Sequence, residues 1–236
     1  MDYITKEDTI IFSPDFNENL DINLISGYAK LIFSDYVLDD KLFEDYENNN
    51  FNSLRFKYSK FNQKVNNLPQ NITHLTFGSD FNQEVNALPQ GLTHLTFGVR
   101  FNQEANNLPQ NITHLTFGYN FDKIFDLLPS IKYLKLDCNN QYIIDNLPNS
   151  LEELELNSNF NLELNNLPTS IHKIMFNKDS IFDKELNCLP NFTKFLQLPE
   201  KYNKKILNLP KELKEIKCSK DYEYASDFTG YNVIHY

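Results

Sequence analysis

A segment of about twenty residues recurs along most of this chain, and the recurrence restricts the chain to folds built from stacked coils. Residues 68–88 read LPQNITHLTFGSDFNQEVNAL, and the next copies read LPQGLTHLTFGVRFNQEANNL and LPQNITHLTFGYNFDKIFDLL. Apolar residues follow each proline at +3, +6, +8, +12, +16 and +19, even after Pro148, where most polar letters differ. A spacing that survives such changes indicates a packing constraint. The repeats start at Pro69, Pro89, Pro109, Pro129, Pro148, Pro168, Pro190 and Pro210.

Each repeat contains a short alternating segment, such as Leu75-x-Phe77, which is typical of a β-strand with one buried face. Strands that return once per coil stack as a parallel sheet, about 4.8 Å apart. The Leu-Pro stretch is expected to form an extended or polyproline-II return side, because proline lacks a backbone donor and restricts the residue before it. The sequence therefore predicts a β-rich solenoid with a parallel sheet of about eleven short strands.

The repeat spacing extends beyond the clear copies, so we expect one solenoid domain over residues 1–236. The turns run from about residue 9 to residue 222, and those in 9–66 are degenerate. One degenerate turn is expected at Tyr28, Leu31, Phe33 and Val37, and the next at Phe51, Leu54, Phe56 and Phe61. Residues 223–236 depart from the spacing and are predicted to form a C-terminal cap. Only eight residues precede the first turn, which predicts a poorly covered end or end-to-end association with another copy.

One aromatic column and two polar columns are expected along the stacked turns. The aromatic side chains should stack inside the solenoid, and the polar ones should satisfy backbone groups that each coil leaves unpaired. The aromatic column holds Phe81, Phe101, Phe121, Phe160, Phe182, Tyr202 and Tyr222. The column before it holds Asp15, Asp80, Asn120, Asn139, Asn159, Asp179 and Asp221, and the column after it Asn17, Asn62, Asn82, Asn102, Asp122, Asn161, Asp183 and Asn203.

The segment LPNSLEELELNSN at 147–159 fits LPxxLxxLxLxxN and resembles a short leucine-rich repeat. The Leu-Pro, the Phe-Asn pair and the aromatic third strand position more closely resemble the FNIP repeat, a leucine-rich-repeat relative of amoebae and their large DNA viruses. This resemblance implies a leucine-rich-repeat-like fold. Family proteins often carry an F-box before the repeats, which recruits a ubiquitin ligase, but degenerate turns occupy that region here.

Composition narrows the classes of function. A net charge of −10 and a pI near 5.0 disfavour nucleic-acid and anionic-membrane partners. No apolar run is long enough to span a bilayer, and the start MDYITKEDTIIF lacks signal-peptide character. Three cysteines, Cys138, Cys188 and Cys218, lie at no motif spacing and are expected to be reduced thiols. A cytoplasmic protein is predicted, in the host cytoplasm if the source is viral.

The candidate binding residues are those on the exposed face of the strands, because the intervening residues point into the core. They offer a small, neutral centre flanked by charges. These residues are His74, Thr76, His94, Thr96, His114, Thr116, Tyr133, Lys135, Glu153, Glu155 and Lys173. Met175 and Asn177 follow Lys173 on the same face. Ser53, Arg55 and Lys57 are expected on this face upstream.

Two chemical roles for strand-face residues are less favoured by the sequence. The histidines form a column at strand spacing that could hold Zn²⁺, but they fall within near-identical copies, so duplication alone explains them. Glu153 and Glu155 are about 7 Å apart, a separation that glycosidases also use. Lys173 and Lys135 are expected to pair with them across strands, which is sufficient reason for both glutamates. No metal site, cofactor or catalytic residue is predicted.

The sequence thus favours a non-catalytic repeat scaffold that binds another protein, of unknown identity, through its strand face. Two alternatives stay open. One is a ubiquitin-ligase adaptor with a divergent helical docking motif in the first sixty residues: a helix across 20–46 would support it, and a sheet strand at Leu31–Phe33 would weaken it. The other is a structural protein that assembles end to end.

Overall fold

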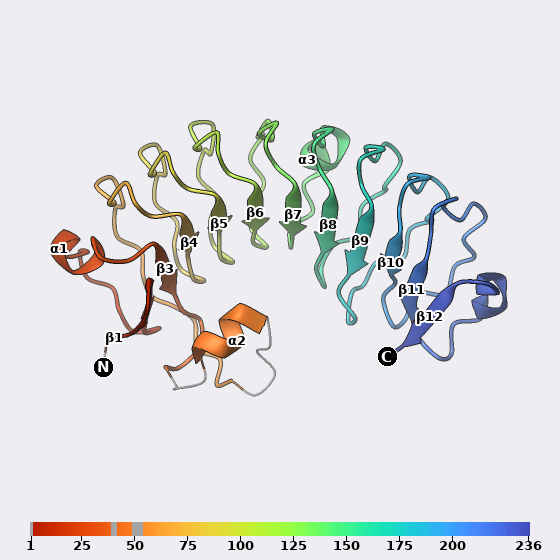
Figure 1. The fold of residues 1–236 in the computed structure, drawn as a ribbon, viewed down its shortest axis with the longest axis horizontal. Helices are drawn as coiled ribbons and strands as arrows, with labels where there is room; N and C mark the ends of the chain where they lie inside the picture. The colour runs from red at the N-terminus through yellow and green to blue at the C-terminus, as the bar shows by residue number, and fades with distance from the viewer. Residues whose placement is uncertain (1, 39–41, 49–53) are drawn as a thin grey trace. The chain divides into compact units, whose positions relative to one another are not determined.

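The computed structural model describes residues 2–38, 42–48 and 54–236 (Figure 1). The chain divides into two compact units, residues 1–112 (unit 1) and 113–236 (unit 2), and each is considered separately. Both consist of short strands that recur once per repeat and are joined by irregular loops (Figure 1). The predicted β-rich, leucine-rich-repeat-like solenoid with a parallel sheet is confirmed.

Unit 1 contains the strands β1 (Tyr3–Lys6), β2 (Thr9–Phe12), β3 (Lys30–Phe33), β4 (His74–Thr76) and β5 (His94–Thr96). Strands β2 to β5 are parallel in chain order, with Leu31, Leu75 and Leu95 in register. The residues before the first turn form β1, which pairs antiparallel with β2. The expectation of a poorly covered N-terminal turn is therefore wrong, because β1 occupies the edge of β2.

Unit 2 contains β6 (His114–Phe117), β7 (Tyr133–Leu136), β8 (Glu153–Leu156), β9 (Lys173–Phe176), β10 (Phe195–Gln197), β11 (Glu215–Cys218) and β12 (Asn232–His235), all parallel. The segment predicted as a C-terminal cap forms a 3-10 helix (Ala225–Phe228) and then β12, which pairs with β11. Phe228 is buried and stacks on Tyr222. The segment therefore covers the last repeat and also adds one strand to the sheet.

Alternation within the strands builds the core. In β4 the side chain of Leu75 is buried while His74 and Thr76 are half-exposed, and β3 and β5 to β11 follow the same pattern. The last strand position and the aromatic column stack on each other within a turn. The ring centroids are 3.6 Å apart for Phe77 and Phe81, and 3.9 Å apart for Phe117 and Phe121. Complete burial of each ring contributes about 1.5–3 kcal/mol to folding.

The column that follows the aromatic position is a ladder of side chain-to-backbone hydrogen bonds. In unit 1, the Oδ1 atom of Asn62 accepts from the N–H of Asn82, and Oδ1 of Asn82 accepts from the N–H of Asn102, each at 2.9 Å. In unit 2 the same bond links Asn161 to Asp183 at 3.1 Å. Each side chain thus satisfies a donor of the next coil, as the sequence predicted.

One turn of unit 2 departs from the predicted columns. Asn139, which was expected before the aromatic position, instead accepts the N–H of Asn161 and so acts as part of the ladder. The reason is the helix α3 (Gln141–Asp145), N-capped by Asn140, which replaces the aromatic position in this turn. Its Ile143 and Ile144 fill the core there.

The degenerate turns were predicted only in part. Strand β3 forms where expected, after the short helix α1 (Ile22–Ile25). The next expected strand, around Leu54 and Phe56, is wrong: among the described residues β3 pairs directly with β4, and Phe56 is exposed. A helix, α2 (Leu42–Asn48), lies between these repeats. Phe51 lies outside the described residues, whereas Phe61 joins the aromatic column.

Candidate functional site

The strand face is defined by the first and third side chains of the repeat strands, which alternate with buried ones. All eleven predicted binding residues lie there and are half-exposed. In unit 1 these are His74, Thr76, His94 and Thr96; in unit 2 they are His114, Thr116, Tyr133, Lys135, Glu153, Glu155 and Lys173. Their positions follow from strand periodicity alone. Arg55 and Lys57, expected on the same face, lie on no strand, and Ser53 lies outside the described residues.

In unit 1 the histidine rings of the strand face stack on each other. The centroids of His74 and His94 are 4.0 Å apart with 13° between the planes. Each Nδ1 atom lies within hydrogen-bond distance of the preceding threonine hydroxyl, at 2.8 Å for Thr73 and 2.9 Å for Thr93. Parallel rings direct their nitrogens along parallel planes, whereas ligands of one metal ion converge on a point. The described residues contain no cluster of three or more His, Cys, Asp or Glu side chains that could hold a metal ion.

In unit 2 the strand face carries paired charges. Lys135 Nζ lies 2.6 Å from Glu155, and Lys173 Nζ lies 2.9 Å from Glu153. The pairing across strands that the sequence predicted is therefore confirmed. The Tyr133 hydroxyl donates to Glu155 at 2.5 Å, and burial, with the nearby Glu155 carboxylate, raises the pKa of Tyr133. Both glutamates thus take part in contacts between neighbouring strands.

His114 is a strand-face residue of unit 2 and lies next to Tyr133 in the sheet register. Its ring stacks on Tyr133, with centroids 5.6 Å apart. Burial lowers the pKa of His114, and Glu153 partly opposes this shift while Lys132 adds to it. The neutral imidazole is thus the favoured form at neutral pH.

The strand face of unit 1 contains a buried position, on β2. Ile11 of β2 belongs to this face, yet it is fully buried. Lys6 of β1 points to the same side, since its pairing partner is Thr9, and its Nζ lies 6.0 Å from the ring centroid of Phe43 in α2. Figure 1 shows α2 near the end of β3.

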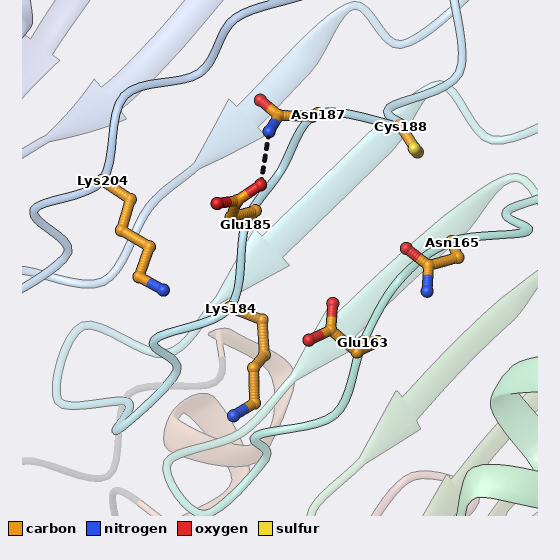
Figure 2. A pocket seen from close by; sticks show the side chains of 7 residues that line it. All are labelled: Glu163, Asn165, Lys184, Glu185, Asn187, Cys188 and Lys204. Carbon is orange, nitrogen blue, oxygen red and sulfur yellow. Dashed lines mark hydrogen bonds between the residues drawn. The ribbon is translucent and has the colours of Figure 1, made fainter.

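The return side of unit 2 has a shallow groove of about 280 Å³ (Figure 2). Its lining is polar and of mixed charge, and Glu185 accepts a hydrogen bond from Asn187 at 2.8 Å (Figure 2). Lys184 is paired with Asp183, outside the groove. The mixture of charges favours no one class of ligand. The lining residues are Glu163, Asn165, Lys184, Glu185, Asn187, Cys188 and Lys204.

These features define a leucine-rich-repeat-like scaffold of the kind used for protein interactions. The FNIP Repeat family model matches three segments, residues 61–98, 101–139 and 139–179. The chain is therefore an FNIP-repeat protein, and the resemblance drawn from its sequence is confirmed. No curated protein sequence matches it. No helix in the described part of the chain has both the length and the apolar character needed to cross a membrane.

A solved structure with a similar fold is CroV588, described as a novel circular LRR protein. The TM-score is 0.61 and the sequence identity is 29%. The alignment covers 94% of this chain and 38% of that one. The present chain thus spans well under half the length of CroV588.

Proposed function

We propose that this protein binds another protein through its strand face and that it performs no catalysis. The observation that carries the proposal is the chemical variety of half-exposed side chains held in fixed register. Thr76 is in register with Thr96 in unit 1, and Tyr133 with Glu153 and Lys173 in unit 2. Repeat proteins use such surfaces because neighbouring coils offer contact positions at regular spacing.

The pairing of charges constrains the kind of contact. Lys135 and Lys173 are neutralised by glutamates of the same face, so the partner is not selected by net charge at this position. The stacked rings of His74 and His94, and the ring of Tyr133, are half-exposed and offer apolar area beside polar atoms. Such groups are enriched at protein interfaces. We expect a partner surface that packs against the exposed edges of these rings and hydrogen-bonds to the ion pairs.

Affinity purification from the native cell type tests the proposal. One variant combines His74→Glu, Thr76→Arg and His94→Glu in unit 1, and a second carries Tyr133→Ala in unit 2. A return-side control, Glu163→Lys with Asn165→Lys, changes exposed residues to a similar extent. Loss of the same partner in a strand-face variant that stays folded, with retention in the control, supports the proposal. Recovery of one set of proteins with all variants refutes it.

A ubiquitin-ligase adaptor is the first alternative, and the structure bears on its premise in two ways. Strand β3 lies in the sheet at residues expected to be helical under this alternative. The helices α1 and α2 are four and seven residues long. The adaptor is the less favoured function. Ligase subunits among the purified proteins would nonetheless support it.

End-to-end assembly is the second alternative, and the similarity to a protein described as circular favours testing it. This chain matches 38% of that chain. Sizing across concentrations distinguishes the possibilities: a mass that rises with concentration supports assembly, whereas a constant monomer mass removes it.

A further inference from the structure

An insertion interrupts unit 1 and carries a second surface, distinct from the strand face. Phe33 and Phe61 stack with centroids 3.8 Å apart, as Phe77 and Phe81 do at 3.6 Å. The first pair is separated by 28 residues in the sequence and the second by four. The additional chain therefore lies between β3 and the return side of the same repeat. It includes α2 and an exposed stretch, residues 54–58, which we term the edge segment.

The insertion is anchored by a buried polar cluster. The Oδ1 atom of Asp35 accepts the backbone N–H of Ser59 at 2.7 Å and that of Ser79 at 2.9 Å. The hydroxyl of Tyr46 in α2 donates to Ser34 at 3.0 Å. Gly78 permits the close approach, because a Cβ atom there would lie 2.3 Å from the Cβ of Ser59. The base of the insertion is thus fixed against the solenoid.

Among the described residues, the edge segment pairs with residues 35–37 alone. Val37 N–H donates to the backbone carbonyl of Arg55 at 2.9 Å, and Lys57 N–H donates to the backbone carbonyl of Asp35 at 2.8 Å, so Tyr36 and Phe56 face each other as an antiparallel bridge. In this pattern the N–H and C=O of Phe56 point away from Tyr36. No hydrogen bond to described residues engages them. With respect to the residues that the structure describes, the segment therefore presents an open backbone edge.

The two faces of the edge segment differ in chemistry. Phe56 and Tyr58 are 52% and 60% exposed, and their rings meet edge to face at 4.9 Å. Tyr36 packs on the same side, 5.7 Å from Phe56. Arg55 and Lys57 lie on the opposite side by alternation. An exposed aromatic pair beside an open backbone edge is an arrangement that binds extended peptides.

Charge selects the kind of peptide. Lys57 and Lys60 both contact Asp15, and these contacts lower the pKa of Asp15 to about 2. Arg55 and the two lysines lie near two carboxylates, those of Asp15 and Asp35, so these described side chains carry one surplus positive charge, although the whole chain has a net charge of −10. We propose that the edge segment binds an extended segment of a partner protein in which acidic and apolar residues alternate. The peptide adds as a strand beside Phe56, with its apolar residues on the aromatic side and its acidic residues on the Arg55 side.

A labelled ten-residue peptide of alternating valine and glutamate, titrated in low salt, provides the test. We expect saturable binding, about tenfold weaker for the matched valine–lysine peptide. Phe56→Ser with Tyr58→Ser, and separately Arg55→Glu, should each weaken binding about fivefold or more. Two further peptides carry N-methyl groups on alternate amides, one peptide for each register. Binding should weaken for the peptide whose methylated amides face the backbone of Phe56. The control Tyr119→Ser, which changes a 52% exposed tyrosine elsewhere, should leave affinity unchanged.

The outcomes separate this site from the other possibilities. Unsaturable binding, equal affinity for the lysine peptide, or unchanged affinity in folded edge-segment variants overturns the proposal. A concentration-dependent dimer that disappears in the Phe56 and Tyr58 variant shows that a second copy occupies the edge, and also overturns it. Because the strand-face variants leave residues 54–58 intact, they should bind the peptide normally, so this test and that of the proposed function are independent.

Discussion

Phe33 and Phe61 occupy the same stacked arrangement as Phe77 and Phe81, although 28 residues rather than four separate them in the sequence. The pair closes its repeat in the normal way, and the insertion leaves from the position where the other repeats make a short turn. A solenoid tolerates this because each coil contacts mainly its neighbours, and because the entropy of closing a loop grows slowly with its length.

The first prediction concerns the aromatic column. Phe81 is fully buried and lies between Phe77 and Phe101. Phe81→Ala removes this stacking and leaves a cavity, so the free energy of unfolding should fall by about 3–5 kcal/mol. Urea unfolding followed by circular dichroism measures this change, because the chain contains no tryptophan.

The matched control is Phe192→Ala, which removes the same ring from a side chain that is 59% exposed. Its unfolding free energy should change by no more than about 0.5 kcal/mol. Equal losses in the two variants would contradict the assignment of Phe81 to a packed column.

Much of the fold follows from the sequence because a solenoid repeats one local rule. The spacing of Leu75 and Phe77 fixes the strand and its buried face, and the next copy fixes the neighbour in the sheet. The fold of the region before residue 60 was harder to predict from the sequence. Leu54 and Phe56 satisfy the apolar spacing of a repeat. The sequence does not reveal that Phe61 instead completes the preceding repeat, by stacking on Phe33.

The strand face was predictable as a set of positions, but its contacts were only partly so. Charge alternation between neighbouring strands predicted that Lys135 would meet Glu155. The hydrogen bond from Tyr133 to Glu155 depends on how far a long side chain reaches, which spacing does not reveal. The sequence did not predict the edge segment. Its position and its outward-facing backbone groups depend on pairing with residues 35–37, which the sequence pattern does not reveal.

The second prediction concerns the asparagine ladder. Oδ1 of Asn82 accepts from the N–H of Asn102 and from Nε2 of Gln103, at 2.9 and 3.1 Å. Asn82→Ala leaves both donors without this acceptor, so the free energy of unfolding should fall by about 1–3 kcal/mol. The exposed Asn165, changed to Ala, should alter it by about 0.5 kcal/mol or less. A neutral result for Asn82→Ala in urea unfolding would show that water replaces the ladder without cost.

The third prediction compares two ion pairs of unit 2. The side chains of Lys135 and Glu155 are 26% and 20% exposed, whereas those of Lys132 and Glu152 are 58% and 44% exposed. Screening by water weakens the second pair. Double-mutant cycles with Lys→Met and Glu→Gln should give a coupling free energy of about 1 kcal/mol or more for the first pair and about 0.5 kcal/mol or less for the second. The reverse order would show that burial does not govern these pairs.

The fourth prediction follows from His114, whose pKa burial lowers below that of the unfolded chain. Below the unfolded pKa, near 6.5, the unfolded state binds a proton that the folded state still resists. The stability associated with neutral His114 is therefore complete above that pH and is lost as pH falls towards the lower folded pKa. His114→Gln removes the group, so the loss of stability between pH 7.5 and 5.5 should be smaller in the variant than in the wild type. Urea midpoints at both pH values measure the difference, and the other titrating groups are common to both proteins. An equal loss in the two proteins would mean that Glu153 fully offsets burial, and a larger loss in the variant would mean that Glu153 outweighs burial and favours the charged imidazole.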